Sequence, residues 1–220
     1  MIYLKKSQPA PMSLAMEKAK ANGLYNKEDV LRQLKIDFKN KCYLCEYQQP
    51  SIQIEHFVAH KGNIDLKFDW NNLFFACGHC NNTKSDKYND ILNCTNKMHD
   101  VENRLKYIFI AFPKEEVKIE SLEKSPTTEN TKNLLLAVYN GTTFQKKLEA
   151  GNLKTILRQE IETFTNLLTY YQEISNTKEQ QECLDKIKFH ISSSSNFTAF
   201  KRWIIKNNPT LKAKFEKYFD

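Results

Sequence analysis

The chain has 220 residues, of which 40% are hydrophobic and 12% aromatic, so it can form a core and is not disordered throughout. The formal net charge of +7 mildly favours a polyanionic partner, and only five glycines favour helices over tight hairpins. No segment is apolar enough to cross a membrane, and the start lacks the apolar run of a signal peptide. We therefore expect a cytoplasmic protein, in which six cysteines favour a metal site over disulfides.

The expected elements begin with two helices. The first covers residues 13–21 and ends before Gly23, and the second starts at an N-cap on Asn26 and leads towards Cys42. From Cys42 to about Ile91 the helical pattern stops, and aromatic residues, asparagines, cysteines and histidines crowd together. The chemistry is expected in this stretch.

After Ile91 the pattern is again mostly helical. The expected elements are a helical face formed by Val101, Leu105, Ile108 and Phe109, a short strand at Val117 and Ile119, a helix from Ser125-Pro126 to Tyr139 ended by Gly141, a long amphipathic helix from Leu153 to Tyr171, a polar break at 192–195, and final helices at 197–205 and after Pro209. This long helical region exceeds what a small module at residues 42–91 needs for packing. It is either a partner-docking surface or the completion of one core.

The cysteines Cys42, Cys45, Cys77 and Cys80 form two Cys-x2-Cys pairs separated by 31 residues. Each pair turns tightly enough to bring both sulfurs to one ion, and four thiolates in a tetrahedron suit Zn²⁺. The alternative is four unrelated core cysteines, which the paired spacing disfavours. Because a closed four-cysteine site has no open position, the zinc is expected to be structural and does not by itself define the function.

The alternation over residues 52–58 predicts a strand with Glu55 and His56 at its functional end, and residues 69–84 are expected to form a loop, a strand and the start of a helix. These two segments resemble the HNH endonuclease family, whose fold is called ββα-metal. The residues that carry the resemblance are Glu55-His56, Asn72-Leu73, Cys77-x2-Cys80, Asn81 and Lys84, in that order within residues 42–90. The resemblance implies an α+β, mostly helical protein with a ββα-metal core. It implies three parts: a helical lead-in at 1–41, the nuclease core at 42–92 and a C-terminal helical region at 93–220.

The resemblance also implies a role for each matched residue. His56 would be the general base, because imidazole titrates near neutral pH. Glu55 and Asn81 would bind one catalytic Mg²⁺ or Mn²⁺ through oxygen, although aspartate and histidine are more usual at these positions. Asn72 would brace the loop and orient the base. Lys84 would contact a phosphate of the nucleic acid, DNA or RNA, near the first helical turn.

Other histidines have simpler interpretations. His60 is a further ligand or, more simply, a surface loop residue, and His79 could replace a sulfur but is more often a bystander in this position. The alternative function, from a different class, is a four-cysteine zinc module that binds nucleic acid or protein without cutting. Only the nuclease interpretation gives Glu55-His56 a purpose.

Three segments resemble a narrower group, the PtuB-like HNH subunit of Septu-type and retron-associated anti-phage systems. They are Ser7-Gln8-Pro9-Ala10-Pro11, Ile54-Glu55-His56-Phe57 and Asp69-Trp70-Asn71-Asn72-Leu73. This resemblance implies a role in defence and a partner subunit that is an ABC/SMC-like ATPase (PtuA-like).

Overall fold

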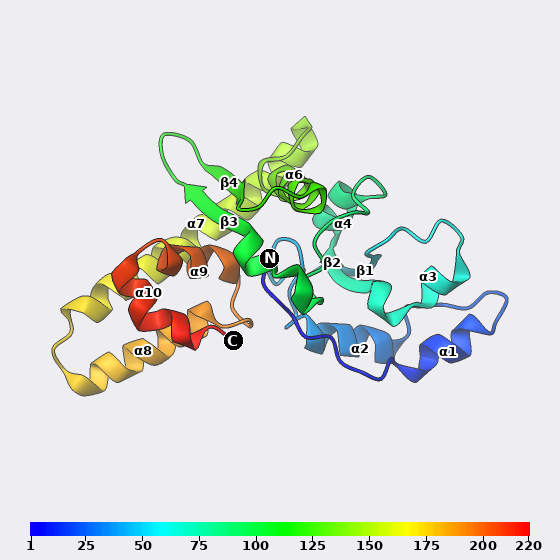
Figure 1. Ribbon diagram of the computed structural model, residues 1–220, viewed down its shortest axis with the longest axis horizontal. Helices are drawn as coiled ribbons and strands as arrows, with labels where there is room; N and C mark the ends of the chain where they lie inside the picture. Colours follow the sequence, from blue (N-terminus) through cyan, green and yellow to red (C-terminus); the bar gives the residue numbers. More distant parts are fainter.

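A computed structural model describes residues 1–220, and Figure 1 shows how its elements are arranged. In chain order the elements are α1 (Met12–Lys18), α2 (Glu28–Asp37), β1 (Ile52–His56), α3 (Ile64–Phe68), η1 (Trp70–Asn72), β2 (Leu73–Cys77), α4 (Gly78–Lys84), η2 (Lys97–His99), α5 (Val101–Arg104), β3 (Leu105–Ile110), β4 (Glu116–Ser121), α6 (Pro126–Asn140), α7 (Phe144–Glu173), α8 (Thr177–Ile191), α9 (Thr198–Lys206), α10 (Pro209–Phe215) and η3 (Glu216–Tyr218). The N-terminal helices, β1, β2 and α4 lie on one side of Figure 1, and α8 to α10 lie on the other.

The first sheet has two antiparallel strands, β1 and β2. Their register pairs Ile52 with Cys77 and His56 with Leu73. Cys77 ends β2 and is also the N-cap residue of α4, so the second cysteine pair spans the change from strand to helix. The prediction of a strand at the Glu55-His56 segment, followed by a loop, a strand and a helix start over 69–84, is confirmed.

The second sheet, β3 with β4, corrects one expectation. The apolar face predicted as a helix is helical only in the short α5, and the chain then forms β3 from Leu105. Antiparallel pairing of Tyr107 with Ile119 and of Phe109 with Val117 supplies hydrogen bonds that a sequence pattern cannot reveal. Aromatic and β-branched residues favour such a strand once it has a partner.

Two helix starts were assigned from capping residues, with different outcomes. Ser125 accepts a hydrogen bond from the amide of Thr128 at the start of α6, and Gly141 follows its end, as predicted. The expected cap at Asn26 is wrong, because Lys27 precedes α2 and makes no side-chain cap.

The C-terminal region contains one helix that the apolar pattern did not indicate. Helix α7 starts earlier than expected, at Phe144, where the Thr143 side chain caps it. Helix α8 was not predicted, because its buried side is only the narrow stripe of Cys183, Ile187 and Ile191 in an otherwise polar sequence. That stripe packs against α7 and the last helices in a second hydrophobic cluster.

The main hydrophobic cluster runs from Met1 to Phe200 and includes residues of all three expected parts of the chain. The apolar side of α7 is inside this core: Leu153 and Leu157 belong to the main cluster, and Phe164 belongs to the second. This face of α7 therefore supports the alternative in which the C-terminal helices complete one core. A docking surface at 93–220 stays a prediction.

The fold is α+β and mostly helical, as predicted, and it contains two small two-stranded sheets. None of its helices combines the length and the apolar character that a bilayer-spanning segment needs.

Candidate functional site

The four paired cysteines meet at one point. The ligand atoms of Cys42, Cys45, Cys77 and Cys80 all lie within 4.8 Å of one another, and the Sγ atoms of Cys45 and Cys77 are 4.0 Å apart. A tetrahedral ion with Zn–S bonds of about 2.3 Å needs sulfur–sulfur distances of about 3.8 Å. All four side chains are buried and none is in a disulfide. The cluster suits a structural zinc, as the spacing predicted.

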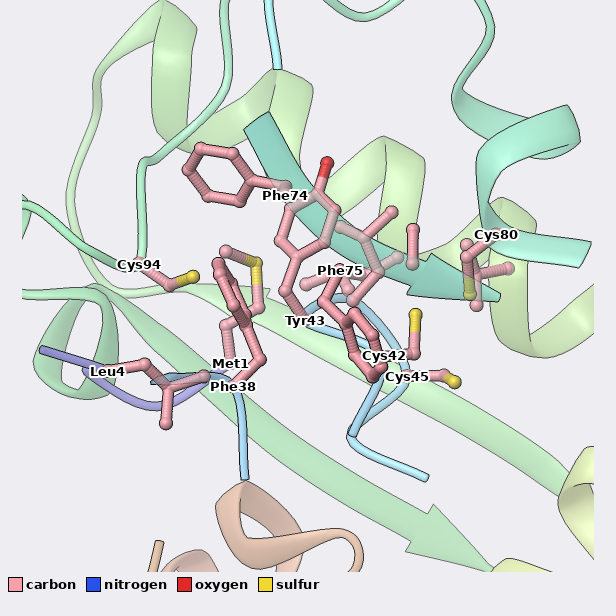
Figure 2. Close-up of a cluster of buried hydrophobic side chains, with 14 of the residues drawn as sticks. Met1, Leu4, Phe38, Cys42, Tyr43, Cys45, Phe74, Phe75, Cys80 and Cys94 are labelled. Atoms are coloured by element: carbon pink, nitrogen blue, oxygen red, sulfur yellow. The ribbon is translucent and has the colours of Figure 1, made fainter. Parts of the chain in front are cut away.

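The two remaining cysteines are separate from this cluster. Figure 2 shows Cys42, Cys45 and Cys80 gathered on one side of the hydrophobic cluster and Cys94 away from them. Burial raises the pKa of the Cys94 thiol to about 12, so this thiol stays protonated at neutral pH. Cys183 lies in the second hydrophobic cluster. Both are core residues.

The turn at residues 42–47, which carries the first cysteine pair, is held by distant helices. The Tyr139 hydroxyl of α6 donates a hydrogen bond of 2.9 Å to the Cys45 carbonyl. The Ala199 amide of α9 donates one of 2.8 Å to the buried Glu46 carboxylate. The zinc turn is therefore part of the core that the C-terminal helices complete.

A cleft of about 350 Å³ opens beside this cluster, between β1 and α4. Its lining residues are Tyr25, Ile54, Glu55, His56, Ala59, His60, Lys61, Asn81 and Ser85. The cleft thus brings together three of the residues singled out by sequence: Glu55 and His56 at the end of β1, and Asn81 on α4. Asn72 and Lys84 do not line it.

His56 is half-buried, and one of its ring nitrogens already has a partner. Nε2 lies 3.0 Å from the Lys67 carbonyl oxygen, so Nε2 is the nitrogen that carries a proton and donates it. In the neutral ring Nδ1 then has a free lone pair. Burial lowers the pKa of His56 below its usual value, which favours this neutral form at pH 7. The rings of Tyr25 and His60 both pack against the imidazole of His56, each with a centroid distance of 4.6 Å.

Glu55 is 4% exposed although it lines the cleft. Its Oε1 lies 2.7 Å from the ammonium of Lys84, which is fully buried. Apart from this ion pair, the two carboxylate oxygens and the buried Tyr43 hydroxyl make no hydrogen bond of normal geometry, although the hydroxyl is near enough to Glu55 to lower the pKa of that carboxyl. Burial raises the pKa of Glu55 to about 7, against the opposing effect of the Lys84 charge.

Lys84 is therefore placed differently from the expectation. It is the last residue of α4 rather than part of its first turn, and its ammonium points to Glu55 instead of solvent. Its contact with a phosphate stays a prediction, and this buried position does not support it.

Asn72 is buried and holds the loop that follows β1. Its side chain accepts a hydrogen bond of 2.7 Å from the Val58 amide and donates to the carbonyls of Val58, at 2.9 Å, and Leu66, at 3.0 Å. The next carbonyl after Leu66 is that of Lys67, the partner of His56. Asn72 thus supports the segment that orients the imidazole.

Asn81 presents its amide group at the cleft. Its Nδ2 donates a hydrogen bond of 2.8 Å to Gln53 Oε1 on β1. The amide oxygen, Oδ1, takes no part in that bond and can accept from or bind another partner. Gln53 was not singled out from the sequence. The alternation of β1 could have indicated it, since Gln53 lies on the same face of the strand as Glu55.

The two uncertain histidines now have defined surroundings. His79 has Nδ1 at 2.6 Å from Glu149 Oε2 and Nε2 at 2.8 Å from the Val138 carbonyl, so both nitrogens are occupied and neither joins the cysteine cluster. His60 lines the cleft, and its Nδ1 accepts a hydrogen bond from the Gly62 amide at 3.2 Å.

Sequence reasoning missed Tyr43 and the Lys67 carbonyl. A bulky aromatic residue inside a four-residue cysteine turn is a signal that could have drawn attention to Tyr43. A backbone carbonyl leaves no signal in the sequence, because every residue has one.

No curated protein matches the chain. The model of the HNH endonuclease family matches residues 42–87, which include the four-cysteine cluster, Glu55, His56 and Asn81. This match supports the HNH family for that segment and, with it, a metal-dependent nuclease.

Proposed function

We propose that this protein hydrolyses phosphodiester bonds of nucleic acid in the cleft between β1 and α4, with His56 as the general base. The observation that carries the proposal is the hydrogen bond from His56 Nε2 to the Lys67 carbonyl, which leaves Nδ1 as the nitrogen that accepts a proton. A general base needs a free lone pair at a fixed position, and a positioned base contributes about 10²–10⁴-fold in rate.

The residues at the cleft fit a hard divalent ion. Glu55 and Asn81 offer oxygen atoms from two different elements, and the buried Oε2 of Glu55 has no partner of its own. Oxygen donors of this kind suit Mg²⁺ or Mn²⁺ rather than a soft metal. A bound ion would supply charge neutralisation at the scissile phosphate and at the leaving oxygen.

The remaining residues support the reaction without touching the phosphate. Asn72 holds the loop whose next carbonyl orients His56. The four cysteines would join the turn at residues 42–47 to the end of β2 and the start of α4 through a zinc ion. Since a closed four-sulfur site has no open position, this zinc takes no part in hydrolysis.

The experiment compares wild type with His56→Ala in cleavage of plasmid DNA and of a structured RNA with added Mg²⁺ or Mn²⁺. We expect His56→Ala to lose about 10²–10⁴-fold in rate while keeping its zinc and its fold. The matched control is His99→Ala, a histidine outside the cleft. A folded, zinc-loaded His56→Ala protein with full activity would remove the general-base role and leave the non-catalytic zinc module as the better account.

We further propose that the nuclease is the effector of an anti-phage defence complex with an ABC/SMC-like ATPase. The support is the resemblance of the segments at 7–11 and 69–73, which lie against each other: Trp70 Nε1 donates to the Ser7 carbonyl at 2.8 Å, and Gln8 Nε2 donates to Asn71 Oδ1 at 3.2 Å. The two matching segments are therefore in direct contact in the fold.

This second proposal is tested by co-expression with the product of the neighbouring gene, which we expect to be an ABC/SMC-like ATPase, followed by purification through a tag on that product. A stable complex in which the nuclease is activated or restrained supports the proposal. Separate elution of two folded proteins, with unchanged nuclease activity, contradicts it.

A further inference from the structure

The Glu55–Lys84 ion pair joins the two elements that form the cleft. Glu55 comes from β1 and Lys84 from the end of α4, and the charged atoms are 2.7 Å apart with side chains that are 4% and 0% exposed. The same ammonium lies 3.4 Å from the His56 carbonyl oxygen, to which it donates. One buried cation therefore contacts both residues of the Glu55-His56 pair.

The ammonium cannot move to solvent without opening the core. The Lys84 side chain is fully buried, and the Phe57 ring lies 5.9 Å from its Nζ. An unpaired buried charge is strongly destabilising, which keeps the two partners together. The contact is therefore a permanent part of the site and differs from the exposed ion pair of Lys61 with Asp86, which is 3.6 Å long.

We propose that Lys84 is a positioning residue that holds Glu55 by Oε1, so that Oε2 stays available to a divalent ion together with Asn81. This inference rests on the proposed nuclease function. Oε2 is buried, has no hydrogen-bond partner and belongs to a residue that lines the cleft. The ion pair thus leaves the carboxylate one oxygen to offer.

The position of Lys84 also relates the two ligand residues to each other. Asn81 and Lys84 are three residues apart on α4, a spacing that places them on the same side of a helix. The ammonium that holds Glu55 therefore ties β1 to the face of α4 that carries Asn81. A second bond between the same elements runs from Asn81 Nδ2 to Gln53 Oε1.

The test measures Mn²⁺ binding by isothermal titration calorimetry on the full, zinc-loaded chain. We expect Lys84→Met to weaken Mn²⁺ binding at least tenfold, although it removes a positive charge from the neighbourhood of the ion. The matched control is Lys61→Met, which removes an exposed charge from the lining of the same cleft. We expect its Mn²⁺ affinity to stay within about twofold of wild type.

A thermal-denaturation cycle separates positioning of Glu55 from a general structural role. We expect Lys84→Met to lower the melting temperature more when Glu55 is present than in a Glu55→Gln background, where no buried carboxylate is left unpaired. Equal losses in both backgrounds contradict the inference. If Lys84→Met does not fold, Lys84→Gln keeps a polar group in the buried site, but its shorter, uncharged side chain does not replace the ammonium on Oε1, so Mn²⁺ affinity is expected to fall as well.

Unchanged or tighter Mn²⁺ binding by Lys84→Met overturns the inference, and tighter binding would mean that the ammonium competes with the ion. The proposed function survives that outcome if His56→Ala is inactive. A wild-type protein that binds no Mn²⁺ and cuts without divalent ions would instead refute the metal requirement, and with it this inference.

Discussion

Replacing Asn72 by alanine removes the side chain that holds the loop after β1. The side chain makes three hydrogen bonds, to the Val58 amide and to the carbonyls of Val58 and Leu66, and it is 5% exposed. At about 1 kcal/mol for each bond, the variant loses about 3 kcal/mol of unfolding free energy, and more if the three backbone groups find no water. This is a large part of the stability of a typical protein.

The measurement is the unfolding of zinc-loaded Asn72→Ala in urea, monitored by circular dichroism and repeated at several zinc concentrations. The control is the neighbouring variant Asn71→Ala. The Asn71 side chain is exposed and is hydrogen-bonded to Gln8, so its removal is expected to lower the unfolding free energy by about 0.5 kcal/mol or less. Activity should fall as well, since the loop presents the Lys67 carbonyl to His56. An Asn72→Ala protein within about 0.5 kcal/mol of wild type would refute the bracing role.

Three further predictions concern zinc, the C-terminal helices and pH. Cys80→Ser should lose bound zinc and aggregate, as measured by elemental analysis and gel filtration; soluble, folded and zinc-free protein would contradict the role of the cluster. A chain truncated after Gly151 should fail to fold, because Leu153, Leu157 and Phe200 belong to the main core, and a soluble, cooperatively melting fragment would contradict this. With Mn²⁺ at a saturating concentration, which keeps the Glu55 carboxyl ionised although burial raises its pKa to about 7, the acid limb of the kcat/KM profile should lie below about pH 6.5, because burial lowers the pKa of His56 and the base must be neutral; an acid limb above that value under these conditions would contradict the assignment.

The zinc turn and the cleft are mechanically connected through Tyr43. This residue lies between Cys42 and Cys45, and its hydroxyl is buried. Burial raises the pKa of Glu55, and the Tyr43 hydroxyl acts in the opposite direction and lowers it. The Tyr43 amide donates to the Phe75 carbonyl of β2 at 3.0 Å. Disorder of the turn after loss of zinc would therefore reach Glu55 directly, so the structural metal and the proposed catalytic residues are expected to fail together.

The local parts of the structure could be predicted because short-range rules determine them. Two cysteine pairs with tight spacing predicted one four-sulfur cluster, and alternation at Ile52 and Ile54 predicted β1. The pair Ser125-Pro126 predicted the start of α6, because capping involves only the next few residues. None of these predictions required knowledge of a distant partner.

The alternation in β1 did not predict which face is buried. Ile52 and Ile54 are only partly buried, whereas Glu55 is almost completely so, because Tyr43 and Lys84 lie on its side of the strand. Apolar character would have assigned the opposite face to the core. The partner that makes burial of a carboxylate possible comes from α4, 29 residues further along the chain.

By itself, the sequence determined the composition of the site: four cysteines for zinc, and Glu55, His56 and Asn81 for the cleft. Only the tertiary structure decided that Lys84 faces inward, that the apolar side of α7 belongs to the core and that residues 105–110 form a strand. The physical reason is the same in each case. Burial and strand pairing depend on partners far away in sequence, whereas metal-ligand spacing and helix caps are set within a few residues.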